Sequence, residues 1–103
     1  MDKRIVWSIR AKEDRREILE YWIKANGNSR YSLKLRKEFF QLIRFLKDFP
    51  NLGKRVYNYD ARCLVKGDYK IFYDLNEDYN NLEIIVLHIW DSRRNPENFK
   101  LLD

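Results

Sequence analysis

The spacing of the apolar residues changes near residue 54 from a helical period to a strand period, and this change restricts the possible folds more than any other feature. From residue 11 to residue 49 the apolar side chains recur at the spacing of α-helices, whereas from residue 62 to residue 90 they alternate with a period of two. Helices followed by a run of strands are typical of the α+β class. We therefore expect two helices packed on one face of a small, mainly antiparallel sheet.

The segment with helical spacing, residues 11–49, predicts an αα-hairpin. Residues 11–25 carry an apolar stripe opposite charged side chains, and residues 26–29, Asn-Gly-Asn-Ser, combine a typical helix end with a helix cap. A second apolar stripe runs from Leu35 to Phe49, and Pro50 and Gly53 close it. Two antiparallel helices joined by so short a segment form a hairpin.

Four strands and a short C-terminal helix complete the predicted fold. Residues 5–9 are β-branched and aromatic, which suits a first strand. Residues 62–66 and 69–75 are separated by a tight-turn signal, and residues 82–90 are apolar on both faces, as a central strand should be. A proline at the first helical position predicts a terminal helix over residues 96–102.

Strict alternation assigns the side chains of the two longest strands to opposite faces. In the earlier strand one face is predicted to carry Tyr69, Ile71, Tyr73 and Leu75, and the other Lys70, Phe72 and Asp74. In the later strand one face is predicted to carry Ile85, Leu87 and Ile89, and the other Ile84, Val86, His88 and Trp90.

The composition indicates one domain over residues 1–103 in a reducing compartment. The chain has 103 residues and only five Gly and Pro together, so it should fold as one compact unit. It has no apolar run long enough to span a bilayer and no secretory signal, and its one cysteine, Cys63, cannot form an internal disulfide. We expect a cytoplasmic protein. Metal-ligand clusters, phosphate-binding glycine loops and nucleophile triads are missing from the sequence, so we expect no metal and no cofactor.

The basic residues are concentrated in the middle of the chain. Residues 30–70 contain eleven Lys or Arg and four Asp or Glu, whereas residues 71–92 contain five acidic residues and no Lys or Arg. The basic segment suggests a polyanion or an acidic protein as partner. The alternative is that these cations are only the solvated faces of helices.

Four stretches together resemble the RelE/ParE superfamily of toxins from bacterial type II toxin-antitoxin systems. These are WSIRAKEDRREILEYW (7–22), FPNLGKRV (49–56), CLVKGDYKIFYDL (63–75) and VLHIWDSRRNPENF (86–99). Each motif is weak alone, and their order and spacing carry the likeness. The resemblance implies a toxin domain with a helical hairpin on a sheet, a growth inhibitor that a cognate antitoxin neutralises, in a possible toxin-antitoxin hetero-oligomer.

The resemblance implies one of two cellular targets, and we expect growth inhibition by ribosome-dependent cleavage of messenger RNA, with gyrase inhibition as the alternative. RelE-like members cut messenger RNA in the ribosomal A site, whereas ParE-like members inhibit DNA gyrase and are not nucleases. A degenerate toxin that only binds its antitoxin is a third reading. Whether the chain is an enzyme, an mRNA interferase, depends on the site, because fold alone does not determine function.

RNA cleavage without a metal needs a base, an acid and cations that stabilise the phosphate. By motif position, Lys70 matches the basic residue after Gly-Tyr in the RelE-like hairpin, and Arg93 or Arg94 matches the basic residue after the last strand. His88 is the only histidine and the candidate proton carrier, the alternative being a hydrogen-bonded core histidine.

A second set of residues is expected to hold nucleic acid. Lys54, Arg55 and Arg62 could position phosphates, or could be a charged loop and an edge strand. Phe99 matches the family's downstream aromatic residue; it can stack on a base, but it has no hydroxyl to transfer a proton. The mechanism requires all these cations to gather around one hollow of the sheet.

Overall fold

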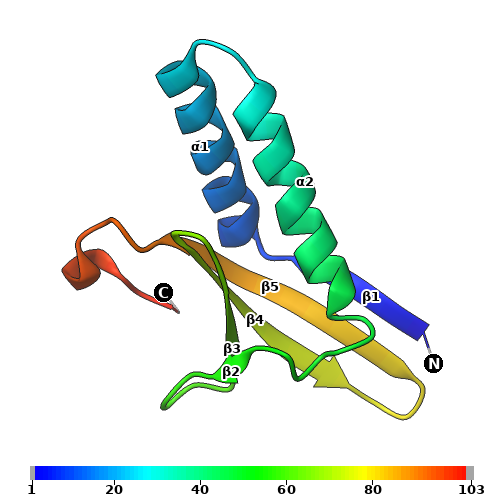
Figure 1. Ribbon diagram of the computed structural model, residues 1–103. Helices are drawn as coiled ribbons and strands as arrows, with labels where there is room; N and C mark the ends of the chain where they lie inside the picture. The colour runs from blue at the N-terminus through cyan, green and yellow to red at the C-terminus, as the bar shows by residue number, and fades with distance from the viewer. Residues whose placement is uncertain (1, 102–103) are drawn as a thin grey trace.

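The computed structural model describes residues 2–101, which form two helices, five strands and a short 3-10 turn. In chain order the elements are β1 (Asp2–Trp7), α1 (Ile9–Asn26), α2 (Arg30–Phe45), β2 (Lys54–Arg55), β3 (Arg62–Lys66), β4 (Tyr69–Glu77), β5 (Asn81–Asp91) and η1 (Pro96–Asn98). The helices stand together as a hairpin on one side of the sheet (Figure 1). The predicted α+β class is confirmed.

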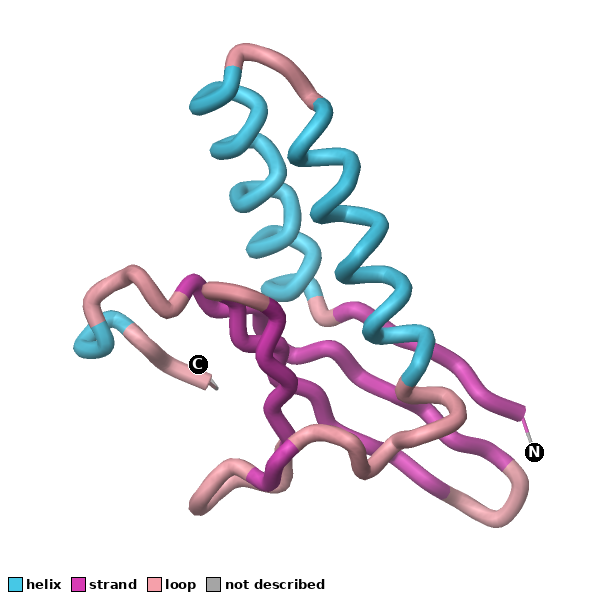
Figure 2. The backbone as a smooth tube through the Cα atoms, viewed as in Figure 1, coloured by secondary structure: helices cyan, strands magenta, loops and turns pink. Residues whose placement is uncertain are grey.

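The five strands form one mixed sheet in the order β1-β5-β4-β3-β2. β1 runs parallel to β5, and the other neighbours are antiparallel. The return from β1 through both helices and three strands to β5 places the first strand beside the last one (Figure 2). β5 is therefore an interior strand along most of its length, as its apolar composition predicted.

The two helices begin and end for local reasons. Ser8 caps α1, because its Oγ accepts a hydrogen bond from the amide of Ala11 at 2.9 Å, so Ile9 is the first helical residue and not the end of the strand. Gly27 ends α1 with φ +70°, a conformation that glycine adopts without strain. α2 ends at Phe45, four residues before the predicted Phe49, and turns follow.

The main core lies between the helices and the sheet. Its buried residues are Ala11, Leu35, Phe39, Ile43, Leu46, Leu64, Tyr69, Ile71, Tyr73, Leu82, Ile84, Val86 and Ile89. Ser32, also buried, donates from Oγ to the carbonyl of Leu19 at 2.9 Å and so joins the two helices. Within residues 2–101, neither helix combines the length and the apolar content that a membrane-spanning helix requires.

A β-bulge changes the faces of β5. Phe72 pairs with His88 and Tyr73 pairs with Val86, so Leu87 is an extra residue in the ladder. The predicted strict alternation is therefore wrong after Val86: Ile89 joins the helix-side core, and Leu87 joins His88 and Trp90 on the opposite face. The alternation predicted for β4 is correct.

The face of the sheet away from the helices has its own small core. Ala61, Phe72, Trp90 and Leu101 are buried there, with Val56, Cys63, Leu87 and Phe99 packed against them. The chain after β5 turns back to supply two of these residues (Figure 2). The predicted helix over 96–102 is only the single turn η1, with Asn95 as its cap, and position 102 lies outside the described residues.

Candidate functional site

The C-terminal end of β5 is held by the first turns of α1. β1 stops at Trp7, opposite Val86, so β5 continues past its parallel neighbour. Ser8 Oγ donates to the carbonyl of Leu87 at 2.9 Å, and an Asp14 carboxylate oxygen accepts from the amide of Ile89 at 3.0 Å. The side chains of Ser8, which caps α1, and of Asp14 in α1 thus satisfy the strand edge that β1 leaves open.

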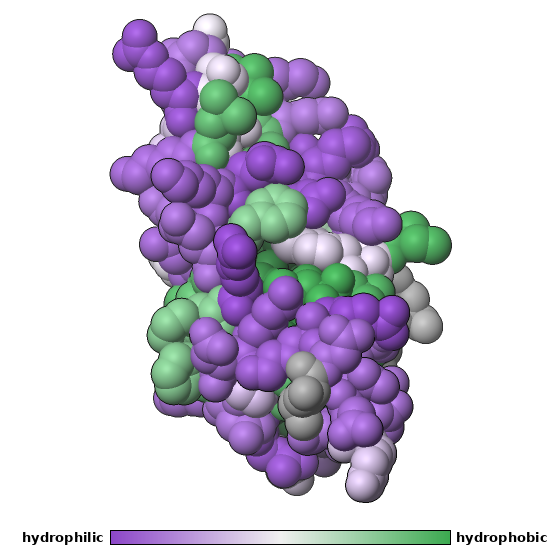
Figure 3. Space-filling view, turned by 90° about the vertical axis from the view of Figure 1, so that its right-hand side faces the viewer, coloured by the Kyte–Doolittle hydropathy of each residue, from purple (hydrophilic) through white to green (hydrophobic). Residues whose placement is uncertain are grey.

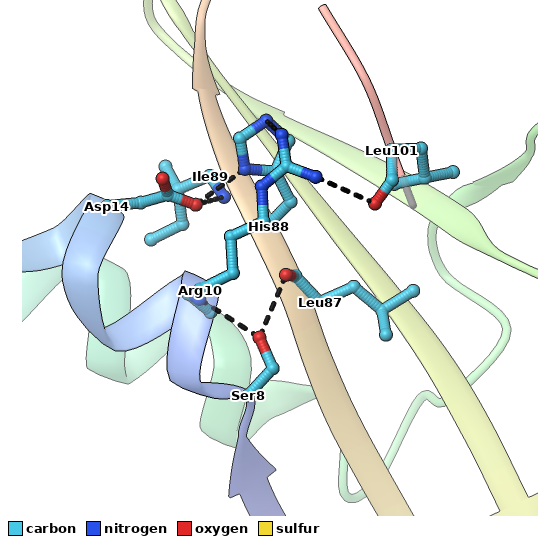
Figure 4. A network of polar contacts seen from close by, with 8 residues as sticks. Ser8, Arg10, Asp14, Leu87, His88, Ile89 and Leu101 are labelled. Carbon is cyan, nitrogen blue, oxygen red and sulfur yellow. Dashed lines mark hydrogen bonds and ion pairs between the residues drawn. The ribbon is translucent and has the colours of Figure 1, made fainter. Parts of the chain in front are cut away.

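His88 is the centre of a buried polar network that Figure 4 shows. Its side chain is 5% exposed, with Nδ1 at 2.5 Å from Asp14 Oδ2 and Nε2 at 3.3 Å from Arg10 Nη2. Arginine only donates, so Nε2 accepts and Nδ1 carries the proton that it donates to Asp14. Arg10 also donates to the carbonyl of Leu101 at 3.2 Å, which ties the C-terminal segment to the same network.

This arrangement does not suit the proton carrier predicted at His88. A general base or acid needs a nitrogen that the substrate can reach. Both ring nitrogens of His88 have protein partners, and the ring packs against Phe72 and Phe99 at centroid distances of 6.1 and 5.8 Å. The geometry is that of the alternative reading, a hydrogen-bonded core histidine.

Arg93 is held by its own neighbours. Its Nε and Nη2 donate to the two carboxylate oxygens of Asp91 at 2.9 and 2.7 Å, and its guanidinium lies 5.2 Å from the ring centroid of Trp22. Trp22 Nε1 in turn donates to Tyr69 Oη at 2.7 Å. The bonds from Arg93 hold the pKa of Asp91 below its ordinary range, and burial raises the pKa of Tyr69.

The Arg93-Arg94 pair lines a hollow of about 520 Å³ between α1 and the end of β5. The same hollow carries the carboxylates of Asp14, Glu17 and Asp91. Arg94 stacks over Trp90, with its guanidinium 5.4 Å from the ring centroid. The arginine pair is therefore offset by acidic groups and is not an isolated cationic site.

Lys70 lies on the other face of the sheet from the helices. It borders a hollow of about 180 Å³ lined also by Phe72, Trp90, Ser92, Pro96 and Phe99. Phe99 contacts Trp90 edge to face at 5.2 Å and so shapes this hollow. Nearby Cys63 is half-buried, and burial raises the pKa of its thiol while the charge of Lys70 opposes that rise.

Arg55 and Arg62 lie near the beginning of β3, away from the other predicted site residues. They border a hollow of about 330 Å³ with Asn51, Asp60, Ala61, Tyr73, Asp74 and Leu75. Arg62 Nη1 donates to the carbonyls of Gly53 at 2.8 Å and Asn51 at 3.3 Å, so it holds the loop after α2. Lys54 is exposed on the short edge strand β2.

The predicted site residues do not share one hollow. The structure brings together Lys70 with Phe99, Arg93 with Arg94, and Arg55 with Arg62, in three places. Arg62 pairs with Tyr73 and so faces the helices, whereas Lys70 pairs with Trp90 and faces away. Among residues 2–101 there is also no group of three His, Cys, Asp or Glu side chains that could hold a metal ion.

One cationic cluster went unrecognised in the sequence. The guanidinium of Arg15 on α1 lies 4.5 Å from the ring centroid of Trp7 and 5.1 Å from that of Phe40, and Arg36 on α2 lies 4.8 Å from Phe40. Burial, and then the charge of Arg36, lower the pKa of Arg15. The sequence position of Arg15 could have indicated this cluster. Arg15 is four residues after Ala11 and three before Ile18, so it lies on the apolar stripe of the helix and not on its charged face.

Comparison with known proteins identifies the family. The sequence model of the family described as "ParE toxin of type II toxin-antitoxin system, parDE" matches residues 5–96. The chain belongs to the ParE toxin family. No curated protein sequence matches it significantly.

The solved structures that share the fold of this ParE-family toxin include a ParDE system chain and a YoeB/ParE toxin. A chain of the "Chromosomal ParDE TA system from P. aeruginosa" has a TM-score of 0.64 and 15% identity, covering 86% of this chain and 92% of that one. The "YoeB/ParE toxin from Agrobacterium tumefaciens" has a TM-score of 0.57 and 16% identity, covering 84% of this chain and 94% of that one. At 15–16% sequence identity, these two structures show that the fold is shared and nothing more.

Proposed function

We propose that this ParE-family toxin arrests growth by binding a protein target, DNA gyrase, without cutting RNA. The single observation that carries the proposal is the state of His88. The only histidine of the chain is buried, with Asp14 on one ring nitrogen and Arg10 on the other. RNA cleavage without a metal requires groups that reach the 2′-hydroxyl and the leaving oxygen, and this histidine faces protein on both sides.

Two further observations support a binding mode. Phe99, which matches the family's downstream aromatic position, has no proton to transfer. The Arg93-Arg94 pair lies among Asp14, Glu17 and Asp91, so its hollow has more carboxylates than guanidiniums and does not favour a phosphate.

Ribosome-dependent RNA cleavage is the second candidate, and the hollow at Lys70 favours it. An exposed amine beside Trp90 and Phe99 is a combination that could hold a phosphate and stack a base. In that case Lys70 supplies the charge and Phe99 the stacking surface.

A paired assay separates the two candidates. Purified toxin is added to DNA gyrase in a supercoiling assay, and to translating ribosomes whose message ends are then sequenced. We expect loss of supercoiling and intact message. Cleaved message that Lys70→Ala protects, with supercoiling unaffected, would overturn the proposal in favour of RNA cleavage.

We further propose that a cytoplasmic cognate antitoxin neutralises this toxin in a hetero-oligomer. The net charge of +5 supports an acidic partner segment. Coexpression with the product of the adjacent gene should restore growth and yield a complex on size-exclusion chromatography. Arrested growth and a lone toxin peak would contradict it.

A further inference from the structure

Two arginines from different helices converge on one aromatic ring. Arg15 of α1 and Arg36 of α2 lie 5.1 and 4.8 Å from the ring centroid of Phe40, and Arg15 also covers Trp7 at 4.5 Å. Trp7 and Phe40 are themselves in contact at 5.3 Å. The aromatic pair at the junction of β1 and the helical hairpin therefore holds both guanidiniums in place.

This arginine pair has no acidic partner within residues 2–101. Other cations of the toxin do have one, namely Lys3 with Asp48, Arg4 with Glu83, Arg16 with Glu13 and Glu20, Lys66 with Glu38, and Arg93 with Asp91. The two like charges repel, which contributes to the lowered pKa of Arg15. An anion placed between them would remove that repulsion and gain two forked donors.

The neighbouring surface indicates what kind of molecule brings the anion. Leu33, Arg36 and Phe40 follow each other at three and four residues on α2, so they share one face of the helix. Leu33 is 61% exposed, which places an apolar position beside the cations. α2 contains five Lys or Arg and one Glu. Figure 3 shows the molecule from the right-hand side of Figure 1, where α2 and the start of β1 lie. On this face, apolar patches are scattered over a hydrophilic surface.

A segment with carboxylates and apolar side chains fits this mixture better than a nucleic acid does. A carboxylate matches the guanidinium fork, and an apolar residue can cover Leu33, whereas a phosphate backbone provides only the charge. We propose that Arg15 and Arg36 form a carboxylate-binding site for an acidic, amphipathic segment of the antitoxin. This inference rests on the proposed function only in naming the antitoxin as the partner.

The test measures the affinity of the purified antitoxin, encoded by the adjacent gene, for toxin variants. We expect Arg15→Gln and Arg36→Gln each to weaken binding about 10-fold, and the double variant about 100-fold. Arg→Lys variants at the same positions should lose less affinity for the antitoxin, because lysine keeps the positive charge and lacks only the forked hydrogen-bond donors of the guanidinium. The matched control is Arg16→Gln on the same helix, which should bind as the wild type does because Glu13 and Glu20 already pair with Arg16.

Stability and salt dependence separate recognition from a structural role. The melting temperature of Arg36→Gln should change by less than about 5 °C, because the lost ring contact is offset by relief of the repulsion. Wild-type affinity should fall with added salt more steeply than that of the double variant.

Two outcomes would overturn the inference. The first is wild-type affinity for the antitoxin in the double variant; if the same variant has lost binding to a single-stranded RNA probe, the arginine pair is assigned to nucleic acid. The second is a wild-type toxin that does not bind the antitoxin at all, and this outcome alone also contradicts the proposed neutralisation.

Discussion

The Asp14 carboxylate lies 2.5 Å from Nδ1 of His88, and the same oxygen accepts the amide of Ile89 at 3.0 Å. One side chain of α1 thus serves both a ring and a backbone group of β5. With Arg10 on the other ring nitrogen and on the carbonyl of Leu101, the network joins the first helix, the longest strand and the C-terminal segment. A buried polar network of this kind stabilises a fold only while every member keeps its partner.

Removal of Asp14 should therefore destabilise the toxin. Asp14→Ala leaves the proton of His88 Nδ1 and the amide of Ile89 without partners, which should lower the free energy of unfolding by about 2 kcal/mol. That corresponds to a fall in melting temperature of about 8–16 °C for a chain of this size. Urea and thermal unfolding followed by circular dichroism measure it. The control is Glu17→Ala, an exposed acidic residue one turn later on the same helix, which should have a small effect. Equal stabilities of the two variants would contradict the role given to Asp14.

The pairing of Asp91 with Arg93 should be visible in an acid titration. The bonds from Arg93 lower the pKa of Asp91 from its ordinary value of 3.8, so the pair stabilises the fold above that pH and its contribution is lost as the pH falls through the lowered value. In Arg93→Gln the pKa of Asp91, measured by NMR on the carboxyl carbon, should rise. The stability difference between wild type and variant, about 1 kcal/mol at neutral pH, should narrow with acid.

The control for this titration is Arg94→Gln. Arg94 acts on the Asp91 carboxylate only through its charge, whereas Arg93 also forms hydrogen bonds to it, so Arg94→Gln should move the pKa of Asp91 less. An unchanged pKa of Asp91 in Arg93→Gln would show that the pair does not persist in solution.

Tyr73 should anchor the loop that follows α2. Its buried hydroxyl donates to the carbonyl of Pro50 at 2.8 Å and accepts from the amide of Gly53 at 2.9 Å. Tyr73→Phe should cost about 2 kcal/mol, because both backbone groups lose their partner where water has little access. Tyr79→Phe, at a residue that is 94% exposed, is the matched control for the loss of a hydroxyl.

The Tyr73→Phe substitution should also change the mobility of the loop around Gly53. A Cβ at Gly53 would lie 2.7 Å from a Tyr73 ring carbon, so only glycine fits there without a shift. Hydrogen exchange at Gly53 should become faster in Tyr73→Phe. Unchanged exchange and unchanged stability together would rule out the anchoring role.

The amino-acid order by itself determined both helices and four of the five strands of this protein; the two-residue strand β2 was not predicted, and the predicted terminal helix is only the turn η1. The helical period over residues 11–25, the glycine at position 27 and the alternation of β4 depend on local backbone preferences and on burial of one face, so they are readable without coordinates. The family likeness was readable for the same reason, because motifs and their spacing are properties of the chain.

Only the tertiary structure decided where the charged groups meet. The bulge at Leu87, the pairing of β5 with β1 and the first turns of α1, and the return of the C-terminal segment together place His88 between Asp14 and Arg10. The same folding separates Arg62 from Lys70 and brings Arg15 next to Arg36. Contacts between residues far apart in sequence depend on strand register and helix placement, and the whole core sets these through packing that no local pattern encodes.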